Sequence, residues 1–216
     1  QMYNKIISRF SESSKLEKES EIFHTNEDLY FMREEDGFNS KEHPKFSYKD
    51  FNKNEDFKSY IKNGSRLELY YKDEIISEAH VIVSSYELDK VILKFGWINS
   101  PNALSQKKPI GVMTFLVASI IYILLKDNEL SHRDIEVSLE IQGEAKRLLE
   151  DEEKKIDVYY RIFRTKKEPP HDEPIDIFRS YTFKAKNRFD DKKYFKDILK
   201  SKEDSIKKAI TNKYEE

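Results

Sequence analysis

The apolar segment at residues 110–125 limits the possible folds more than any other feature, because it lies between two stretches that alternate in polarity. Lys126 and Asp127 end the segment, and its length is below the roughly 20 residues that span a bilayer. We therefore predict a helix that is buried on nearly all sides, with a membrane-inserted segment as the minor alternative. Its apolar residues are Val112, Met113, Phe115, Leu116, Val117, Ile120, Ile121, Ile123, Leu124 and Leu125.

Alternation of apolar and polar residues predicts strands on both sides of this helix. Because the helix connects the strand at 90–98 to the strand at 133–141, these two strands must be parallel in an otherwise antiparallel sheet. The sequence thus predicts an α/β (α+β) fold, with a mixed, mostly antiparallel twisted sheet that contains a splayed parallel pair and is flanked by helices. The predicted strands are 66–71, 77–86, 90–98, 133–141, 157–164 and 175–186, and a further helix is predicted at 143–155.

The two ends of the chain are more polar than its middle. Residues 3–10 fit either a strand or a short helix, and residues 12–64 are charged and broken, with a helix predicted at 48–61. Near the C-terminus, apolar residues at helical spacing predict an amphipathic helix in a lysine-rich tail. We therefore divide the chain into a main domain, 1–189, and a C-terminal helix, 190–216.

Composition narrows the classes of function that the chain can have. The 39 basic and 41 acidic residues nearly cancel, which argues against a general nucleic-acid-binding surface. The absence of cysteine excludes disulfides, thiolate catalysis and cysteine-ligated zinc. The 5 histidines show no paired metal-ligand spacing, so no metal site is predicted. The sequence opens without the apolar region of a signal peptide, and we expect a cytoplasmic location.

The segment 106–113 has the features of a phosphate-binding loop. The start of a helix offers backbone N–H groups without intrahelical partners, together with the positive end of the helix dipole. Gly111 lets a ligand approach the backbone, and Lys107 and Lys108 add positive charge. A basic turn before a core helix is the alternative interpretation of the same residues.

In this loop, and in the order of strands and helices over about residues 3–187, the sequence resembles the GNAT (GCN5-related N-acetyltransferase) superfamily. The family's loop has Arg or Gln, two residues, Gly, one residue and then Gly or Ala, and Lys108, Gly111 and Met113 stand at those positions. The resemblance implies acyl-CoA-dependent N-acetylation, with acetyl-CoA as cofactor and an amine as acceptor, either a small molecule or a protein lysine or N-terminus. The cofactor-binding residues that it implies are Ile98, Gln106, Lys107, Lys108, Gly111, Val112, Met113 and Ala145.

A second signature of the family is Asn, two residues, Ala, two residues and Leu-Tyr, at the helix that follows the fifth strand. The segment 142–149 keeps this spacing around Ala145, but Leu149 replaces the tyrosine that serves as general acid in the family. The resemblance therefore implies cofactor binding more directly than it implies catalysis. A catalytically inactive protein of the same fold, used for binding or as a scaffold, is the alternative function.

Acyl transfer also needs a base, because an ammonium group cannot attack a thioester. Glu136 and Glu140 share one face of the strand at 133–141, and Tyr159 or Tyr160 would supply an acid from the next strand. We predict Glu140 and Tyr159 as the catalytic residues. Solvated carboxylates and sheet tyrosines are the structural alternative for the same side chains.

Overall fold

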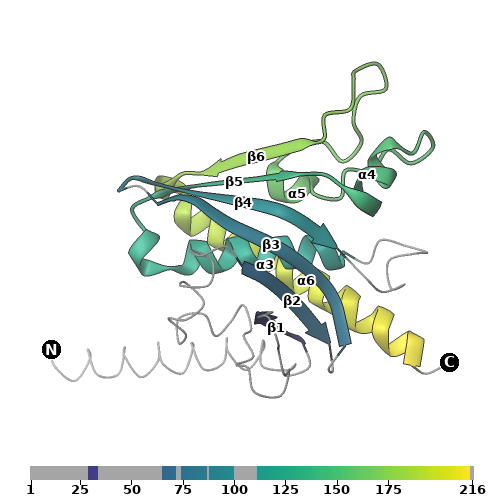
Figure 1. Cartoon of the computed structure of the whole chain (residues 1–216), viewed down its shortest axis with the longest axis horizontal. Coiled ribbons are helices and arrows are strands. Elements are labelled where there is room, and N and C mark those ends of the chain that lie inside the picture. Colours follow the sequence, from purple (N-terminus) through teal and green to yellow (C-terminus); the bar gives the residue numbers. More distant parts are fainter. Residues whose placement is uncertain (1–28, 34–64, 72–73, 87, 100–110, 215–216) are drawn as a thin grey trace, which may run out of the picture.

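The computed structural model describes residues 29–33, 65–71, 74–86, 88–99 and 111–214 (Figure 1). The predictions for the N-terminal strand or helix and for the helix before residue 64 lie outside these ranges.

The described strands form one mixed sheet whose spatial order follows the chain. Every neighbouring pair is antiparallel except β4 and β5, which are parallel and are joined through the helix α3 (Val112–Lys126). This arrangement confirms the predicted fold class, because a helical crossover is the usual way to connect adjacent parallel strands. The strands are β1 (Leu29–Arg33), β2 (Ser65–Tyr71), β3 (Glu74–Tyr86), β4 (Lys90–Asn99), β5 (Asp134–Glu140) and β6 (Phe178–Phe183).

The ladder of the parallel pair ends before β4 does. Its ladder runs from Lys90 opposite Asp134 to Phe95 opposite Leu139, and β4 then continues to Asn99. The end of β4 therefore extends past its pairing with β5, at the place where the predicted splay falls. The chain enters α3 from this same end of β4.

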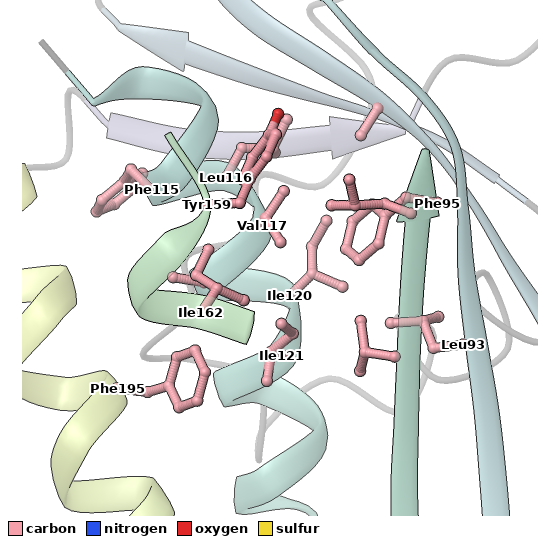
Figure 2. Close-up of a cluster of buried hydrophobic side chains, with 14 of the residues drawn as sticks. Leu93, Phe95, Phe115, Leu116, Val117, Ile120, Ile121, Tyr159, Ile162 and Phe195 are labelled. Carbon is pink, nitrogen blue, oxygen red and sulfur yellow. The ribbon is translucent and has the colours of Figure 1, made fainter. Parts of the chain in front are cut away.

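The helix α3 is the centre of the hydrophobic core, as predicted. Figure 2 shows it between Leu93 and Phe95 of β4 on one side and Phe195 on the other. Its buried Ser119 is satisfied within the helix, because the hydroxyl donates to the Phe115 carbonyl over 2.7 Å. Each large apolar side chain that folding buries contributes roughly 1.5–3 kcal/mol. Within the described ranges, no helix combines the length and the apolar character needed to cross a membrane.

The C-terminal helix α6 (Arg188–Tyr214) packs against α3 and shares its core. Its buried apolar residues recur at helical spacing, as the amphipathic pattern predicted. The phenyl rings of Phe183 and Phe195 meet edge to face at 5.3 Å between centroids, which ties the helix to β6. The buried apolar residues of α6 are Phe195, Ile198, Leu199 and Ile206.

The predicted strand at 157–164 is wrong. This segment is a turn followed by the short helix α5 (Tyr160–Phe163). The Asp157 carboxylate accepts a hydrogen bond from the Tyr159 amide over 2.9 Å, which closes a local turn instead of extending a strand. The buried apolar and aromatic side chains are Tyr159, Ile162 and Phe163, which follow helical i, i+3, i+4 spacing and not the period of two.

Other differences concern where elements begin and end. The helix predicted at 143–155 is α4 (Gly143–Glu150), and it ends early because the Asp151 carboxylate accepts the amides of Glu153 and Lys154. The strand predicted at 175–186 is shorter, and the Asp176 carboxylate accepts the Phe178 amide where β6 begins. Two short 3₁₀ turns complete the described elements, η3 (Asn128–Leu130) and η4 (Ala185–Asn187).

The strand β1 was not predicted. It pairs antiparallel with β2 and contains Leu29, Tyr30 and Phe31, which stand within the charged and broken stretch of the sequence at 12–64. Aromatic and branched residues of this kind favour strands, but the surrounding charges obscure the alternation.

Candidate functional site

The amino end of α3 is the first part of the candidate site. Gly111 precedes the helix in the left-handed conformation, with φ 85° and ψ 20°. Gly111 has no side chain to cap the helix, none of the described residues caps it, and no acidic residue lies in its first turn. The first backbone N–H groups of a helix have no intrahelical acceptor, so this end offers donors and a partial positive charge to a ligand.

A pocket of about 280 Å³ opens at this end of α3, and we call it the α3 pocket. Four parts of the chain form its wall: the start of α3, one side of α4, the segment around α5, and a lysine of α6. The start of α3, the stretch from α4 through α5, and α6 are far apart in the sequence, so only the folded chain assembles the pocket. Its lining residues are Gly111, Val112, Met113, Thr114, Glu144, Leu148, Ile156, Asp157, Val158, Tyr160, Arg161, Lys167 and Lys202.

Each of the two acidic side chains that line the α3 pocket forms an ion pair with an arginine outside the lining. The Glu144 carboxylate accepts hydrogen bonds from Nε and Nη2 of Arg147, over 2.8 and 2.5 Å, and these bonds lower the pKa of Glu144. The buried Asp157 carboxylate accepts a hydrogen bond from Nε of Arg179 over 3.0 Å. Neither arginine lines the pocket.

The basic side chains of the pocket have no such partners. In the described part of the chain, no carboxylate forms an ion pair with Arg161, Lys167 or Lys202. Arg161 and Lys167 are exposed, whereas Lys202 is partly buried. Burial lowers the pKa of Lys202, and the neighbouring charges of Arg161 and Lys167 lower it further. Among the described residues, the pocket therefore has a surplus of positive charge that no carboxylate balances.

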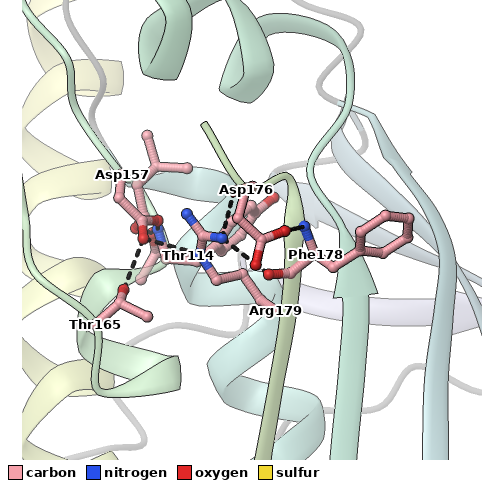
Figure 3. Close-up of polar contacts among 8 residues, drawn as sticks. Thr114, Asp157, Thr165, Asp176, Phe178 and Arg179 are labelled. Atoms are coloured by element: carbon pink, nitrogen blue, oxygen red, sulfur yellow. Dashed lines mark hydrogen bonds and ion pairs between the residues drawn. The ribbon is translucent and has the colours of Figure 1, made fainter. Parts of the chain in front are cut away.

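The segment around α5 is held in place by Asp157 (Figure 3). Besides Arg179 and the Tyr159 amide, its carboxylate accepts the Thr165 hydroxyl over 2.6 Å. Nη1 of Arg179 in turn donates to the carbonyls of Asp176 and Phe178, over 2.6 and 2.9 Å. These bonds attach one wall of the α3 pocket to the start of β6.

Two further contacts fasten the same wall to the helices. The Thr114 hydroxyl donates to the Val158 carbonyl over 3.0 Å, and the Tyr194 hydroxyl donates to the Arg161 carbonyl over 2.8 Å. The Arg164 guanidinium lies 3.6 Å from the centroid of the Tyr194 ring and forms an ion pair with Asp191. The pocket wall is thus attached to α3, β6 and α6 together.

The structure brings together only some of the predicted cofactor residues. Gly111, Val112 and Met113 line the α3 pocket. Ile98 and Ala145 do not line it, because Ile98 packs beside the core and Ala145 is buried within it. The remaining predicted residues, Gln106, Lys107 and Lys108, lie outside the described ranges.

Neither of the predicted catalytic residues lines the α3 pocket. Glu140 is exposed at the carboxyl end of β5, opposite Phe178 of β6. Tyr159 is buried with 2% of its surface exposed, and this burial raises the pKa of its phenol. It belongs to a turn and not to a strand, because of the Asp157 hydrogen bond described above. Of the alternatives, Glu136 forms an ion pair with Lys90 and Tyr160 lines the α3 pocket.

Sequence reasoning missed the pocket's own basic residues, Arg161, Lys167 and Lys202. No local pattern marks them, since each stands among other charged residues. The incorrect prediction of a strand at 157–164 also places Arg161 on a sheet face and not in the pocket lining. Among the described residues, no group of three or more histidine, aspartate or glutamate side chains could hold a metal ion.

Replacing Gly111 with alanine is expected to destabilise the protein by roughly 1–2 kcal/mol, the cost of a left-handed L-residue. An added Cβ would also lie 2.6 Å from Cδ of Lys202 and displace that side chain. Gly143→Ala is the matched control, because Gly143 also has positive φ, at 56°, but a Cβ there meets nothing within 4 Å. Urea unfolding measures the free energy of unfolding of both variants. If Gly143→Ala lowers this free energy much less than Gly111→Ala does, the additional loss at Gly111 comes from the displaced Lys202 side chain.

Comparison with known proteins gives a distant likeness only. No protein-family model and no curated protein matches the sequence. Among solved structures, the fold is similar to a GNAT family acetyltransferase from Elizabethkingia anophelis with acetyl-CoA bound. The similarity has a TM-score of 0.30 and 13% identity, over 56% of this chain and 70% of that chain. A likeness this low establishes neither the family nor the function of the chain.

Proposed function

We propose that the α3 pocket binds the phosphates of an acyl-CoA and that the protein transfers the acyl group to an amine. The observation that carries this proposal is the charge of the pocket. Each of its acids forms an ion pair with an arginine outside the lining, while its bases have no acidic partner in the part of the chain that the structure describes. A cavity with surplus positive charge next to a free helix N-terminus is a site for an anion. A volume of about 280 Å³ is at the lower limit for a small-molecule site, which suits the diphosphate and the adjacent part of the cofactor.

The wall residues have complementary roles in this proposal. The first backbone N–H groups of α3 donate to phosphate oxygens, and Gly111 leaves the backbone open to them. Lys202 supplies a charge inside the pocket, whereas Arg161 and Lys167 supply charges at its edge. Hydrogen bonds between charged partners contribute about 1.5–3 kcal/mol each, and exposed ones contribute less.

Acyl transfer requires a neutral amine, whose nitrogen forms a bond to the thioester carbonyl as the carbon–sulfur bond breaks. In our proposal Glu140, at the open end of β5, takes the proton from the substrate ammonium. The departing CoA thiolate takes a proton from an acid, and that acid regains a proton from the attacking nitrogen as the amide forms. Tyr160, which lines the pocket, is better placed to donate the proton than the buried Tyr159.

A CoA-binding protein without turnover is the second candidate. It is favoured by the burial of two side chains, because Leu149 and Tyr159 occupy the core and neither reaches the pocket lining. This candidate shares the cofactor site with the first and differs only in the absence of chemistry.

Calorimetric titration with CoA and acetyl-CoA tests the binding step. We expect a dissociation constant in the micromolar range, equivalent to about −8 kcal/mol, and an affinity that falls as salt increases. Absence of binding at millimolar ligand would defeat both candidates.

Release of free CoA thiol from acetyl-CoA, with a panel of amines, separates the two candidates. Because the chain contains no cysteine, a thiol-reactive dye reports only the released CoA, with no protein background. Turnover that Glu140→Gln lowers by about 100-fold or more supports transfer with a base in that role. Tight binding with no thiol release across the panel supports the non-catalytic candidate.

A further inference from the structure

The side chain of Lys202 reaches into the α3 pocket from a different part of the fold than the predicted loop. It extends from α6 to the start of α3, where an ideal Cβ on Gly111 would lie 3.0 Å from its Nζ. The ammonium is therefore at the positive end of the α3 dipole, where a cation is disfavoured. Two more cations, Arg161 and Lys167, line the same pocket.

We propose that Lys202 is a phosphate-binding residue which the unliganded protein holds at a cost in stability, so that α6 is a functional wall of the site. This inference rests on the proposed function, because it names a residue that binds the ligand's phosphates. A purely structural lysine is expected to have an acidic partner or to extend its ammonium into solvent. Lys202 is partly buried, and no carboxylate of the described chain pairs with it.

The local electrostatics agree with this role. Burial and the charges of Arg161 and Lys167 lower the pKa of Lys202, which means that its charged form is disfavoured in the unliganded pocket. A bound phosphate would reverse that balance, because its negative charge compensates all three cations. Binding residues commonly reduce the stability of the protein that carries them, and replacing them then stabilises the unliganded state.

This reasoning gives the variant Lys202→Met two effects of opposite direction. The unliganded protein is expected to melt at the same temperature as wild type or higher, because methionine keeps the apolar stem and removes the unbalanced charge. The affinity for inorganic pyrophosphate and for CoA is expected to fall at least tenfold, the equivalent of losing one charge-assisted hydrogen bond.

The matched control is Lys200→Met, because Lys200 is exposed on the same helix and does not line the pocket. It changes the net charge equally and is expected to leave both the melting temperature and the affinities near those of wild type. Lys202→Arg keeps a cation at the site and is expected to recover most of the lost affinity.

The experiment records thermal unfolding of full-length wild type and the three variants, each without ligand, with pyrophosphate and with CoA at constant ionic strength, together with calorimetric affinities. The expected result is ligand stabilisation in wild type, Lys200→Met and Lys202→Arg, and its loss in Lys202→Met. A Lys202→Met protein that melts several degrees lower but binds both ligands as wild type does would overturn the inference and leave the proposed function standing. Pyrophosphate binding that depends on Lys202, without any CoA binding, would overturn the proposed function and support the phosphate role of Lys202.

Discussion

Replacing Asp157 with alanine is expected to lower the free energy of unfolding by about 3–5 kcal/mol, the usual cost of removing one partner of a buried ion pair. The side chains of Asp157 and Arg179 are only 1% and 9% exposed, so the guanidinium would remain buried without its carboxylate. The Tyr159 amide and the Thr165 hydroxyl would lose the same acceptor. Urea denaturation measures the change directly.

The control for this prediction is Asp176→Ala. Its carboxylate accepts the Phe178 amide at an exposed position, and its loss is expected to cost no more than about 1 kcal/mol. Under conditions where Asp157→Ala remains folded, its affinity for CoA is also expected to fall, because Asp157 holds the pocket wall. Equal, small losses for both variants would show that the buried pair contributes little to the fold.

Replacing Phe195 with alanine is expected to cost about 3–5 kcal/mol, the range for removing a large side chain from a packed core. Phe195 is fully buried, and its edge-to-face contact with Phe183 adds to the loss. Lys202 is about two turns further along the same helix, so loosening α6 is also expected to weaken CoA binding. Thermal unfolding and calorimetry measure the two effects.

Phe189→Ala is the matched control, because this phenylalanine is on the same helix with 76% of its surface exposed. We expect a change within about 0.5 kcal/mol, as for most surface substitutions. The pair therefore tests whether α6 is integral to the domain. A Phe195→Ala protein as stable as the Phe189→Ala protein would show that the helix is an appendage, as the division at residue 189 assumed.

The parts of the fold with strong periodicity could be predicted from the sequence. The clean alternation of Ile135, Val137 and Leu139 identified β5, and the continuous apolar run identified α3. Their order alone required the parallel pair. The prediction for the segment at 157–164 was wrong because Val158, Tyr160 and Ile162 stand at every second position, as in a strand, while the side-chain hydrogen bond of Asp157 decides the local conformation. A competition of this kind between a side chain and a backbone ladder is not visible in periodicity.

Only the part of the candidate site that comes from one continuous stretch of sequence could be predicted. Gly111 and the start of α3 follow from one stretch of sequence, and the structure places them in the pocket lining. Lys202 comes from a helix whose apolar spacing was recognised, but which lysine of that helix faces α3 depends on how the two helices pack. The charge surplus of the pocket depends on ion pairs with Arg147 and Arg179 that no motif describes.

Glu144 and Asp157 form ion pairs with arginines that do not line the α3 pocket. The net charge of the pocket is therefore determined in part by residues that would not contact a ligand. Arg147 is on the solvent side of α4 and Arg179 is on β6, yet each keeps one carboxylate from neutralising the pocket's lysines. Loss of either arginine would leave an unpaired carboxylate in the α3 pocket and change the net charge that the proposed ligand meets. Substitutions at Arg147 or Arg179 can therefore change which ligands the pocket prefers, although neither residue lines it.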